Sequence, residues 1–402
     1  MPGTEEKLAE GSQAGYIGFD PTADSLHIGS LVQIMILVHF QRAGHKPFAL
    51  VGGATGMVGD PSGKSQERNL LDIETLNKNL AGVKKQLEQF LDFDCGDTSA
   101  EVVNNYDWFK DFNFLNFIRD VGKHISINYM LAKDSVKSRL DTGMSFTEFT
   151  YQLVQGYDFY WLWKNKKCMV QLGGSDQWGN ITAGIDMIRR RKADGAHGLT
   201  VPLMTRADGA KFGKTADGAV WLDAARTLPY ELHQYFVNVD DRDVERFLLH
   251  LTLLSVDEVA SVMAEHGRAP ESRAAQKRLA DEVCSLVHGD SETARARLAA
   301  KGLFGVEPPT GEVLEALRGI VPETTVKAGD LDGDESLVDV LVASGLCGSR
   351  GDARRTLAGG GVSVNGVRQV PEALALPSDA LVDGRFVLLQ KGRRNRHLLV
   401  LA

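Results

Sequence analysis

The sequence predicts an α/β protein with a parallel sheet, followed by an all-helical domain and a small basic α+β module. Three observations support this prediction: two glycine-punctuated strand-to-helix turns, helical spacing after residue 228, and a reversal of charge near the carboxyl terminus. With 402 residues, of which 43% are hydrophobic, the chain is long enough for two or three domains and at least one sizeable core.

The amino-terminal part predicts a βαβ unit. Residues 14–19, AGYIGF, form an apolar run that DPTADS ends, and residues 26–43 have helical spacing that Gly44 closes. A second strand, KPFALVGG, follows. The same punctuation recurs where CMVQLGGSDQWGN runs into ITAGIDMIRRR. Such units build parallel sheets, whose ligands lie at the carboxyl ends of the strands, so the two turns can face one crevice.

The rest of the chain predicts a helical domain, a linker and a small basic module. Helical spacing dominates from LPYELHQYF at 228 to about residue 303, whereas residues 305–335 mix proline, glycine and acidic residues. We therefore predict the α/β domain at 1–225, the helical domain at 226–304, a linker at 305–335 and the basic module at 336–402.

Charge separates the last module from the rest. Residues 346–402 contain nine Lys and Arg and four Asp and Glu, a balance of +5, so the first 345 residues must sum to -13 for the net charge of -8. A cationic module on an acidic body indicates a polyanionic partner. A basic surface that is merely solvated remains the alternative.

Cysteine usage and the amino terminus indicate the compartment. Cys95, Cys168, Cys284 and Cys347 are scattered, without a C-x-x-C pair, which favours neither a zinc site nor a disulfide framework. MPGTEEKLAEGSQ has no apolar signal region, and IMILVHF is too short to span a bilayer. We expect a cytoplasmic protein.

The stretch HIGS places His27 and Ser30 three residues apart near a helix start, so on a helix they would share a face. Free backbone N–H groups and the helix dipole favour an anion there, and phosphate is the obvious candidate. A histidine beside apolar residues is, however, more often a packing residue with a satisfied hydrogen bond.

The stretch GGATGMVGDPSGKS, residues 52–65, is a glycine-rich loop that ends near Lys64 and Arg68. Its spacing does not match a P-loop. Cations on such a loop can reach phosphate, with Asp60 near a substrate; the alternative is a tight turn with solvated charges.

The stretch KFGKT, residues 211–215, lies in a polar, glycine-bearing loop. Lys211 and Lys214, with Thr215, can neutralise charge that develops on a polyphosphate. An isolated K-x-x-K is more often an exposed basic turn.

The stretch YQLVQGYD puts Tyr151, Gln155 and Asp158 on one helical stripe. If the stripe faces inward, its polar groups need partners, which a small polar ligand would supply. Otherwise the stripe is a solvent face.

Taken in order, HIGS, YQLVQGYD, GGSDQWGN and KFGKT resemble the bacterial tyrosyl-tRNA synthetases, which are class I aminoacyl-tRNA synthetases. The resemblance runs from about Tyr16 to the end of the chain and includes GFDPTADSLHIG, LVGGATGMVGDPSGKS, NNYDW, DSVKSRL, SFTEF and LTVPL. It implies a Rossmann-type catalytic domain, a helical tRNA-contacting domain and a small RNA-binding module of a ribosomal-protein type. VDVLVASGLCGSRGDARRTLAGGGVSVNG matches that module and supplies Arg350, Arg354 and Arg355.

The resemblance also implies roles for individual residues. Tyr16 and Asp158 would bind the phenol of tyrosine, and Gln177 its carboxylate. The remaining assignments are Asp60, Tyr151 and Gln155 to the ammonium group; Gly18, Asp20, Gly29, Gly174 and Asp176 to the adenylate; and Thr22, His27, Ser30, Lys64, Arg68, Lys211, Lys214 and Thr215 to the ATP phosphates. Lys214 thus serves both ATP binding and catalysis.

The resemblance further implies a homodimer whose substrates are tyrosine, ATP and tRNA(Tyr). Magnesium would accompany ATP without a metal site made by the protein. Neither DNA nor a membrane is expected as a partner.

Two departures from the family pattern are visible. Ser30 stands where a histidine or asparagine is usual, and it cannot carry charge, so we expect slower adenylation than in a Ser30→His variant. Only 15 residues precede Tyr16, where relatives generally carry a longer helical segment, so weaker dimerisation is a possible consequence.

The main alternative function is a noncatalytic RNA-binding relative. Activation of tryptophan is disfavoured because Tyr16 and Asp158 suit a hydroxyl.

Overall fold

The computed structural model describes residues 1–62, 71–137, 139, 143–191, 195–210, 212–215, 218–305 and 307–402, with only the backbone at 214–215. The chain forms two compact units, one of Met1–Thr227 with Asp240–Met263 and one of Leu228–Val239 with Ala264–Ala402. Within the described ranges, every helix is too short or too polar to cross a membrane.

The first unit is built on a five-stranded sheet in the order β3-β2-β1-β4-β5. Every neighbouring pair in it is parallel, so the predicted parallel sheet is confirmed. Its strands are β1 (Ala14–Phe19), β2 (Lys46–Val51), β3 (Glu101–Asn104), β4 (Cys168–Gly174) and β5 (His197–Val201).

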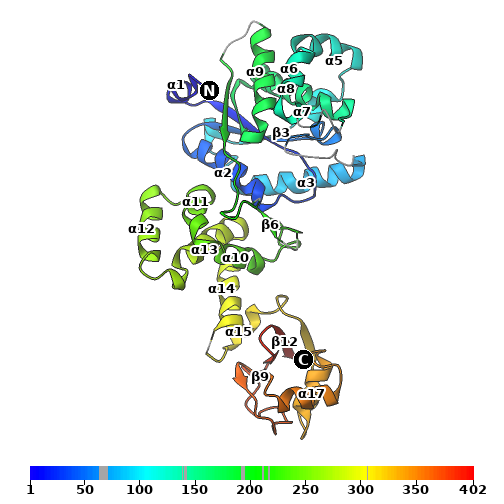
Figure 1. The fold of residues 1–402 in the computed structure, drawn as a ribbon, viewed down its shortest axis with the longest axis vertical. Coiled ribbons are helices and arrows are strands. Elements are labelled where there is room, and N and C mark those ends of the chain that lie inside the picture. The colour runs from blue at the N-terminus through cyan, green and yellow to red at the C-terminus, as the bar shows by residue number, and fades with distance from the viewer. Residues whose placement is uncertain are drawn as a thin grey trace. The chain divides into compact units, whose positions relative to one another are not determined.

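Helices cover both faces of this sheet. The helices α2 (Ile28–Arg42) and α3 (Ile73–Phe90) pack on one face, and α8 (Phe146–Lys166) and α9 (Trp178–Arg190) pack on the other (Figure 1). Because α2 lies between the sheet and other elements, most of its apolar side chains are buried. The α/β layering follows from these apolar faces.

The strand order creates a crevice. The chain proceeds from β1 to β2 and β3 on one side, and β4 and β5 lie on the other side of β1. Ligands of such sheets bind where the order reverses, outside the carboxyl ends of the strands. Here those ends are Phe19 of β1 and Gly174 of β4.

Short elements complete the first unit. They are α1 (Thr4–Ala9), η1 (Thr55–Met57), η2 (Gly96–Thr98), α4 (Tyr106–Phe109), α5 (Phe114–Asp120), η3 (Gly122–His124), α6 (Ile127–Leu131), α7 (Asp134–Lys137), η4 (Ser175–Gln177), β6 (Lys214–Thr215), β7 (Gly218–Ala219) and α11 (Asp241–Leu251). The helix α12 (Val256–His266) spans the boundary of the two units.

The second unit begins with helices. They are α10 (Pro229–Val237), η5 (Pro270–Ser272), α13 (Ala274–His288) and α14 (Asp290–Phe304). All regular structure between residues 226 and 304 is helical, as the spacing predicted. The division differs from the expected single domain, because residues 240–263, which include α11, belong to the first unit.

A second sheet follows, in the order β10-β9-β11-β12-β8. One face packs on α14 and α15 through Leu303, Leu314 and Leu398, and the other packs on α16 and α17 through Leu341, Leu357 and Leu389. The elements are α15 (Gly311–Ala316), β8 (Glu323–Val326), η6 (Ala328–Asp330), α16 (Ser336–Ala343), α17 (Arg350–Ala358), β9 (Val362–Val364), β10 (Val367–Arg368), β11 (Phe386–Lys391) and β12 (Asn395–Leu401).

The predicted linker over 305–335 is wrong in its main part. This stretch carries α15 and β8, and β8 pairs in parallel with β12 from Glu323↔Leu398 to Val326↔Leu401. Proline, glycine and acidic residues gave the segment a linker-like composition. Its strand is stabilised by a partner about 75 residues later, which local composition does not reveal.

The helix predicted at 26–43 also needs correction at its start. His27 is the N-cap, with φ -115° and ψ 169°, and the helix begins at Ile28. His27 and Ser30 therefore do not share a helix face, because the backbone of His27 is extended.

Candidate active site

A cavity of about 430 Å³ lies at the carboxyl ends of β1 and β4. It is lined by all the predicted residues of the catalytic domain that the structure describes with their side chains. These are Tyr16, Gly18, Asp20, Thr22, His27, Gly29, Ser30, Asp60, Tyr151, Gln155, Asp158, Gly174, Asp176 and Gln177.

Two buried groups that can bind a hydroxyl form one end of the cavity. Tyr16 on β1 is 1% exposed, and its Oη has no hydrogen-bond partner within the described ranges. Burial, followed by the nearby Asp158, raises the pKa of Tyr16 well above its usual range, so the phenol stays protonated. Burial also raises the pKa of Asp158 to about 8.

Asp158 is held by two donors that the sequence did not single out. Trp108 Nε1 donates to Oδ1 over 2.9 Å, and Asn105 Nδ2 donates to Oδ2 over 3.1 Å. Both bonds favour the charged carboxylate and partly oppose the effect of burial. Both donors belong to the stretch NNYDW, which supports the family resemblance but to whose residues the sequence analysis assigned no role.

Gln171 is a third residue that was not predicted from the sequence. It lies on β4, is 2% exposed, lines the cavity, and its Oε1 has no partner in the described part of the chain. The sequence feature that could have identified it is the position of a polar residue inside the apolar run CMVQLGG. A buried amide in such a strand needs a partner.

The middle of the cavity contains a network of amides and a carboxylate. Gln177 Nε2 donates to Asp60 Oδ2 over 2.8 Å, and Gln155 Nε2 donates to Gln177 Oε1 over 3.4 Å. Asn180, which was also not predicted, donates to Gln177 Oε1 over 3.2 Å. The network fixes the orientation of Asp60, Gln155 and Gln177 relative to one another.

Tyr151 joins the helix α8 to the end of β1. Its hydroxyl donates to Asp20 Oδ2 over 2.9 Å, and Thr55 Oγ1 donates to Asp20 Oδ1 over 2.7 Å. Burial, followed by Asp20, raises the pKa of Tyr151 well above its usual range. Tyr151 and Asp158 are 4% and 1% exposed, so the predicted stripe on α8 faces inward.

The stretches HIGS and KFGKT meet at two glycines. A Cβ on Gly29 would lie 2.8 Å from His27 Cε1, so glycine there leaves room for the imidazole. Gly213 has φ +85°, and a Cβ there would lie 3.1 Å from Gly29 N. The backbones therefore approach each other more closely than other residue types would allow.

Five predicted phosphate-binding groups are not located. Lys64, Arg68 and Lys211 lie outside the described residues, as do the side chains of Lys214 and Thr215. The backbone at 214–215 forms β6, which pairs with β7.

The cavity contains no ligand set for a metal ion. Among the described residues, no three His, Cys, Asp or Glu side chains are grouped so that they could hold one.

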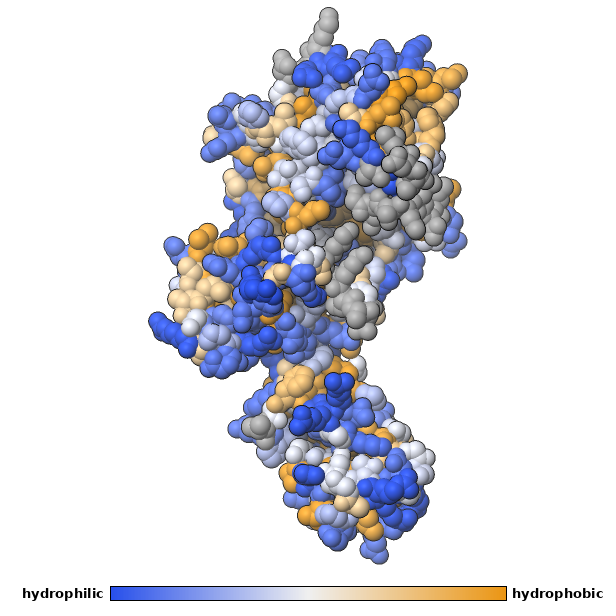
Figure 2. Space-filling view, viewed as in Figure 1, coloured by the Kyte–Doolittle hydropathy of each residue, from blue (hydrophilic) through white to orange (hydrophobic). Residues whose placement is uncertain are grey.

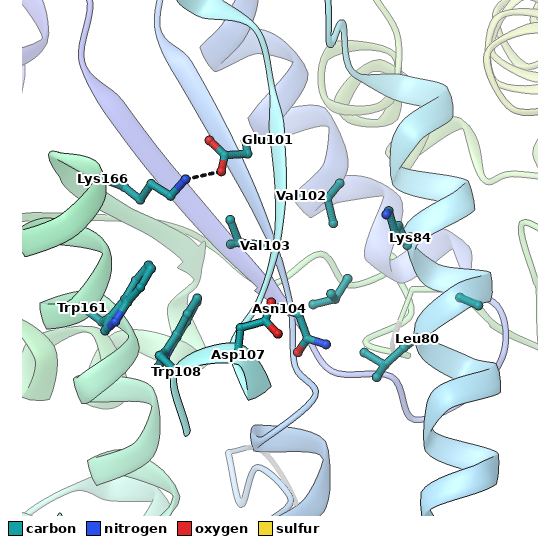
Figure 3. Close-up of a pocket in the computed structure, with 12 residues that line it drawn as sticks. Leu80, Lys84, Glu101, Val102, Val103, Asn104, Asp107, Trp108, Trp161 and Lys166 are labelled. Atoms are coloured by element: carbon teal, nitrogen blue, oxygen red, sulfur yellow. Dashed lines mark hydrogen bonds and ion pairs between the residues drawn. The ribbon is translucent and has the colours of Figure 1, made fainter. Parts of the chain in front are cut away.

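A second cavity of about 430 Å³ lies beside the edge strand β3, between α3 and α8 (Figure 3). Glu101 on β3 forms an ion pair there with Lys166 on α8 (Figure 3). Trp108 and Trp161 stack in its wall with ring centroids 4.3 Å apart. Trp108 also donates to Asp158, so it links this cavity to the part of the first cavity that contains Asp158 and Tyr16. Of the predicted site residues whose side chains the structure describes, none lines the second cavity.

The predicted RNA-binding arginines lie on α17 of the second unit. Arg350 and Arg354 both donate to Glu335, the latter over 2.8 Å to Oε1, and Arg350 also pairs with Asp339 at 2.9 Å. Arg355 is exposed and forms no ion pair within the described residues. The three arginines are thus close in sequence but differ in their acidic neighbours.

Comparisons with known proteins agree over nearly the whole chain. A family model described as tRNA synthetases class I (W and Y) matches residues 9–305, and one described as a tyrosine–tRNA ligase SYY-like C-terminal domain matches residues 313–399.

Similar proteins and structures agree with these matches. The chain is 50% identical over 402 residues to a tyrosine–tRNA ligase of Anaeromyxobacter dehalogenans, covering 99% of this chain and 95% of that protein. It is 49% identical over 413 residues to one of Flavobacterium psychrophilum, with the same coverages. A C-terminally truncated mitochondrial tyrosyl-tRNA synthetase of Aspergillus nidulans matches with a TM-score of 0.65 at 33% identity, over 73% of this chain and 86% of that structure.

Proposed function

Because this chain belongs to the class I tRNA synthetases of the tryptophan and tyrosine type, we propose that it is a tyrosine–tRNA ligase that works through the residues of the first cavity. It activates tyrosine with ATP and then transfers the tyrosyl group to the 3′ end of tRNA(Tyr). The alternative, a noncatalytic RNA-binding relative, keeps the fold without the chemistry.

One observation carries the assignment of the site. Four buried polar atoms in the cavity wall have no hydrogen-bond partner among the described residues: Tyr16 Oη, Gln155 Oε1, Gln171 Oε1 and Asp176 Oδ1. Buried polar groups are nearly always paired, and each one left unpaired costs about 1–3 kcal/mol. Their convergence on one cavity supports a polar ligand with several hydrogen-bonding groups.

The arrangement at one end suits a phenol. The hydroxyl of tyrosine donates to Asp158 and accepts from Tyr16, whose raised pKa keeps its proton in place. Phenylalanine would leave the Tyr16 hydroxyl buried and unpaired, and it would offer Asp158 no donor beyond Trp108 and Asn105. Tyrosyl-tRNA synthetases are the established example of this penalty and reject phenylalanine by roughly 10⁵, a magnitude that belongs to the family and does not come from the geometry of this site.

The remaining predicted residues bind successive groups of the two substrates, from the ammonium group of tyrosine to the phosphates of ATP. Asp60, Tyr151 and Gln155 bind the ammonium group, and Gln177 lies near the carboxylate. The adenylate is held by Gly18, Asp20, Gly29, Gly174 and Asp176, and the phosphates by Thr22, His27, Ser30, Lys64, Arg68, Lys211, Lys214 and Thr215.

In the first step, a carboxylate oxygen of tyrosine attacks the α-phosphorus of ATP. The bond between that phosphorus and the bridging oxygen breaks, and pyrophosphate leaves. Negative charge grows on the leaving group, so cations that contact it most strongly in the transition state accelerate the step selectively. Magnesium bound to ATP would screen the same charge.

In the second step, a ribose hydroxyl at the 3′ end of tRNA attacks the tyrosyl carbonyl carbon. The carbon–oxygen bond to the phosphate breaks and AMP leaves. Arg350, Arg354 and Arg355 contribute contacts to tRNA phosphates from the second unit.

We also place the enzyme in the cytoplasm as a homodimer. Exposed apolar side chains support the second assignment: Phe114, Leu115, Ile118, Ile127 and Phe146 are 48–71% exposed. Figure 2 displays apolar surface over α5. Contiguous apolar surface of this kind is typical of protein–protein contacts.

Tyrosine-dependent exchange of pyrophosphate into ATP tests the function. The protein should exchange with tyrosine and not with phenylalanine or tryptophan, whereas Lys214→Ala should be strongly impaired. Exchange no faster than in Lys214→Ala, together with retained tRNA binding, would favour the noncatalytic alternative. Exchange that responds to tryptophan would overturn the assignment of Tyr16 and Asp158.

A further inference from the structure

The loop that leads into KFGKT is attached to the helix α11. This loop begins at Met204 and returns at Phe212, whose backbone N–H donates to Met204 O over 3.4 Å. Met204, Thr205 and Phe212 all line the first cavity. Whatever fixes this loop therefore also fixes one wall of the site.

Asp243 on α11 is the centre of the attachment. It is 3% exposed, and its Oδ2 accepts the backbone N–H of Ala207 over 2.8 Å. Its Oδ1 accepts from Arg246 Nη2 over 2.7 Å. Arg246 Nη2 also donates to the carbonyl oxygen of Thr205. One buried carboxylate and one arginine thus hold two successive parts of the loop backbone.

An aromatic contact fixes the other side of the loop. Phe212 and Phe247 are 6% and 1% exposed, and their rings meet edge-to-face with centroids 4.8 Å apart. Phe212 is followed by Gly213, which lies against Gly29 N. The ring of Phe247 therefore supports the point where KFGKT approaches HIGS.

We propose that Asp243 and Phe247 are positioning residues for adenylate formation, which act by fixing the loop that carries Lys211 and Lys214. The inference rests on the proposed function of those lysines. Asp243 and Phe247 lie outside the predicted motifs and do not line the cavity. They act through Ala207, Phe212 and Gly213, and they hold the described backbone before and after position 211.

The chemistry explains why positioning here matters for one step. Cations that stabilise departing pyrophosphate contribute mainly in the transition state, so a displaced loop lowers the rate and leaves the binding of tyrosine unchanged. Displacement by about 1 Å can cost up to about 100-fold in rate. We expect a smaller effect when one anchor is weakened and the other remains.

The test compares Asp243→Asn with Glu245→Gln in the full-length protein. Both changes remove one negative charge from α11, but Glu245 is exposed and has no ion pair within the described ranges. We expect Asp243→Asn to form tyrosyl-adenylate about tenfold more slowly in single-turnover experiments at saturating ATP. Its affinity for tyrosine and its thermal melting should match those of Glu245→Gln.

A second pair of variants keeps the proposal testable if Asp243→Asn is unstable. Arg246→Gln removes the donor to Thr205 from a side chain that is 42% exposed, and Phe247→Leu keeps apolar volume while removing the ring. Both should slow adenylate formation with unchanged tyrosine affinity. Rates equal to those of Glu245→Gln, or equal losses of tyrosine affinity and rate, would overturn the proposal. Absence of exchange in the unmodified protein would instead overturn the proposed function.

Discussion

Trp108, which lines the second cavity, donates its indole N–H over 2.9 Å to Oδ1 of Asp158, which lines the first. Asn105 donates to the other carboxylate oxygen. Each oxygen thus keeps a lone pair for a ligand while the plane of the carboxylate is fixed. A carboxylate held in this way presents its remaining lone pairs in fixed directions to the hydroxyl of a phenol.

The raised pKa of Asp158 predicts a pH-dependent stability. The pKa is about 8 in the folded state against 3.8 for an ordinary aspartate carboxyl group, so folding takes up a proton between these values and stability falls as pH rises through that window. Asp158→Asn cannot titrate. Relative to the unmodified protein, it should gain at least about 2 kcal/mol of unfolding free energy between pH 5 and pH 8.

Urea denaturation of both proteins at pH 5, 6, 7 and 8 measures this difference. Any constant loss caused by the altered bonds to Asn105 and Trp108 cancels in the comparison. A difference in stability that does not change with pH would show that Asp158 is ionised throughout.

Tyr16→Phe separates recognition of the phenol from stability. The Oη of Tyr16 has no partner within the described residues, so its removal should raise the unfolding free energy, by about 1–3 kcal/mol at most, and should not lower it. We expect kcat/KM for tyrosine to fall about 3- to 10-fold, while phenylalanine is activated as slowly as before. Pyrophosphate exchange with each amino acid checks this, and an unchanged preference would remove Tyr16 from the phenol site.

Local patterns explain why the fold was predictable. The strands of the first sheet are short apolar runs that end in glycine or a polar turn; α2 follows as a nearly continuous apolar run, and α9 follows with clear apolar spacing. Each signal lies within about 20 residues, so the βαβ arrangement could be derived without knowledge of distant contacts. The start of α2 was placed too early because a cap residue differs from a helical one only in its backbone angles.

The structural features that the sequence did not reveal depend on contacts between residues far apart in the chain. Strand β8 depends on β12, and Asp243 depends on Ala207, 36 residues earlier in the chain. No pattern near either residue indicates its partner. Gln171 is different, since a buried amide within an apolar strand was visible in the sequence and could have been chosen as a site residue.

Ser30→His tests the departure at the helix start. Ser30 lines the cavity, and its backbone N–H donates to His27 O over 2.8 Å. Histidine at this position adds reach and a second potential donor to phosphate, so adenylate formation should be about 3- to 10-fold faster, the effect of one additional hydrogen bond. Single-turnover rates at saturating tyrosine and ATP measure it. An equal or lower rate would mean that serine is already sufficient here.

Phe146→Glu tests the proposed dimer. Phe146, the first residue of α8, is 70% exposed, so the change should leave the fold of the subunit intact while placing a charge in an apolar contact. Light scattering after size-exclusion chromatography should give two subunits for the unmodified protein and mainly one for the variant. Lys164→Glu, on the exposed last turn of α8, is the control that should stay dimeric. Two subunits in both variants would place the interface elsewhere.

The arginines of α17 should contribute unequally to tRNA binding, because their acidic neighbours differ. Glu335 must be displaced from Arg354 before a phosphate can take its place, whereas Arg355 forms no ion pair within the described residues and only a longer-range attraction to Asp352. Arg355→Ala should weaken tRNA binding and lower the slope of log K against log salt by about 1. Arg354→Ala should have a smaller effect on both. Glu335→Gln should strengthen binding about 2- to 5-fold, because it removes the exposed ion pairs of Glu335 with Arg350 and Arg354, whereas Glu372→Gln, an exposed change in the same unit, should not. If Glu335→Gln weakened binding, Glu335 would instead be needed to orient the arginines toward the phosphates.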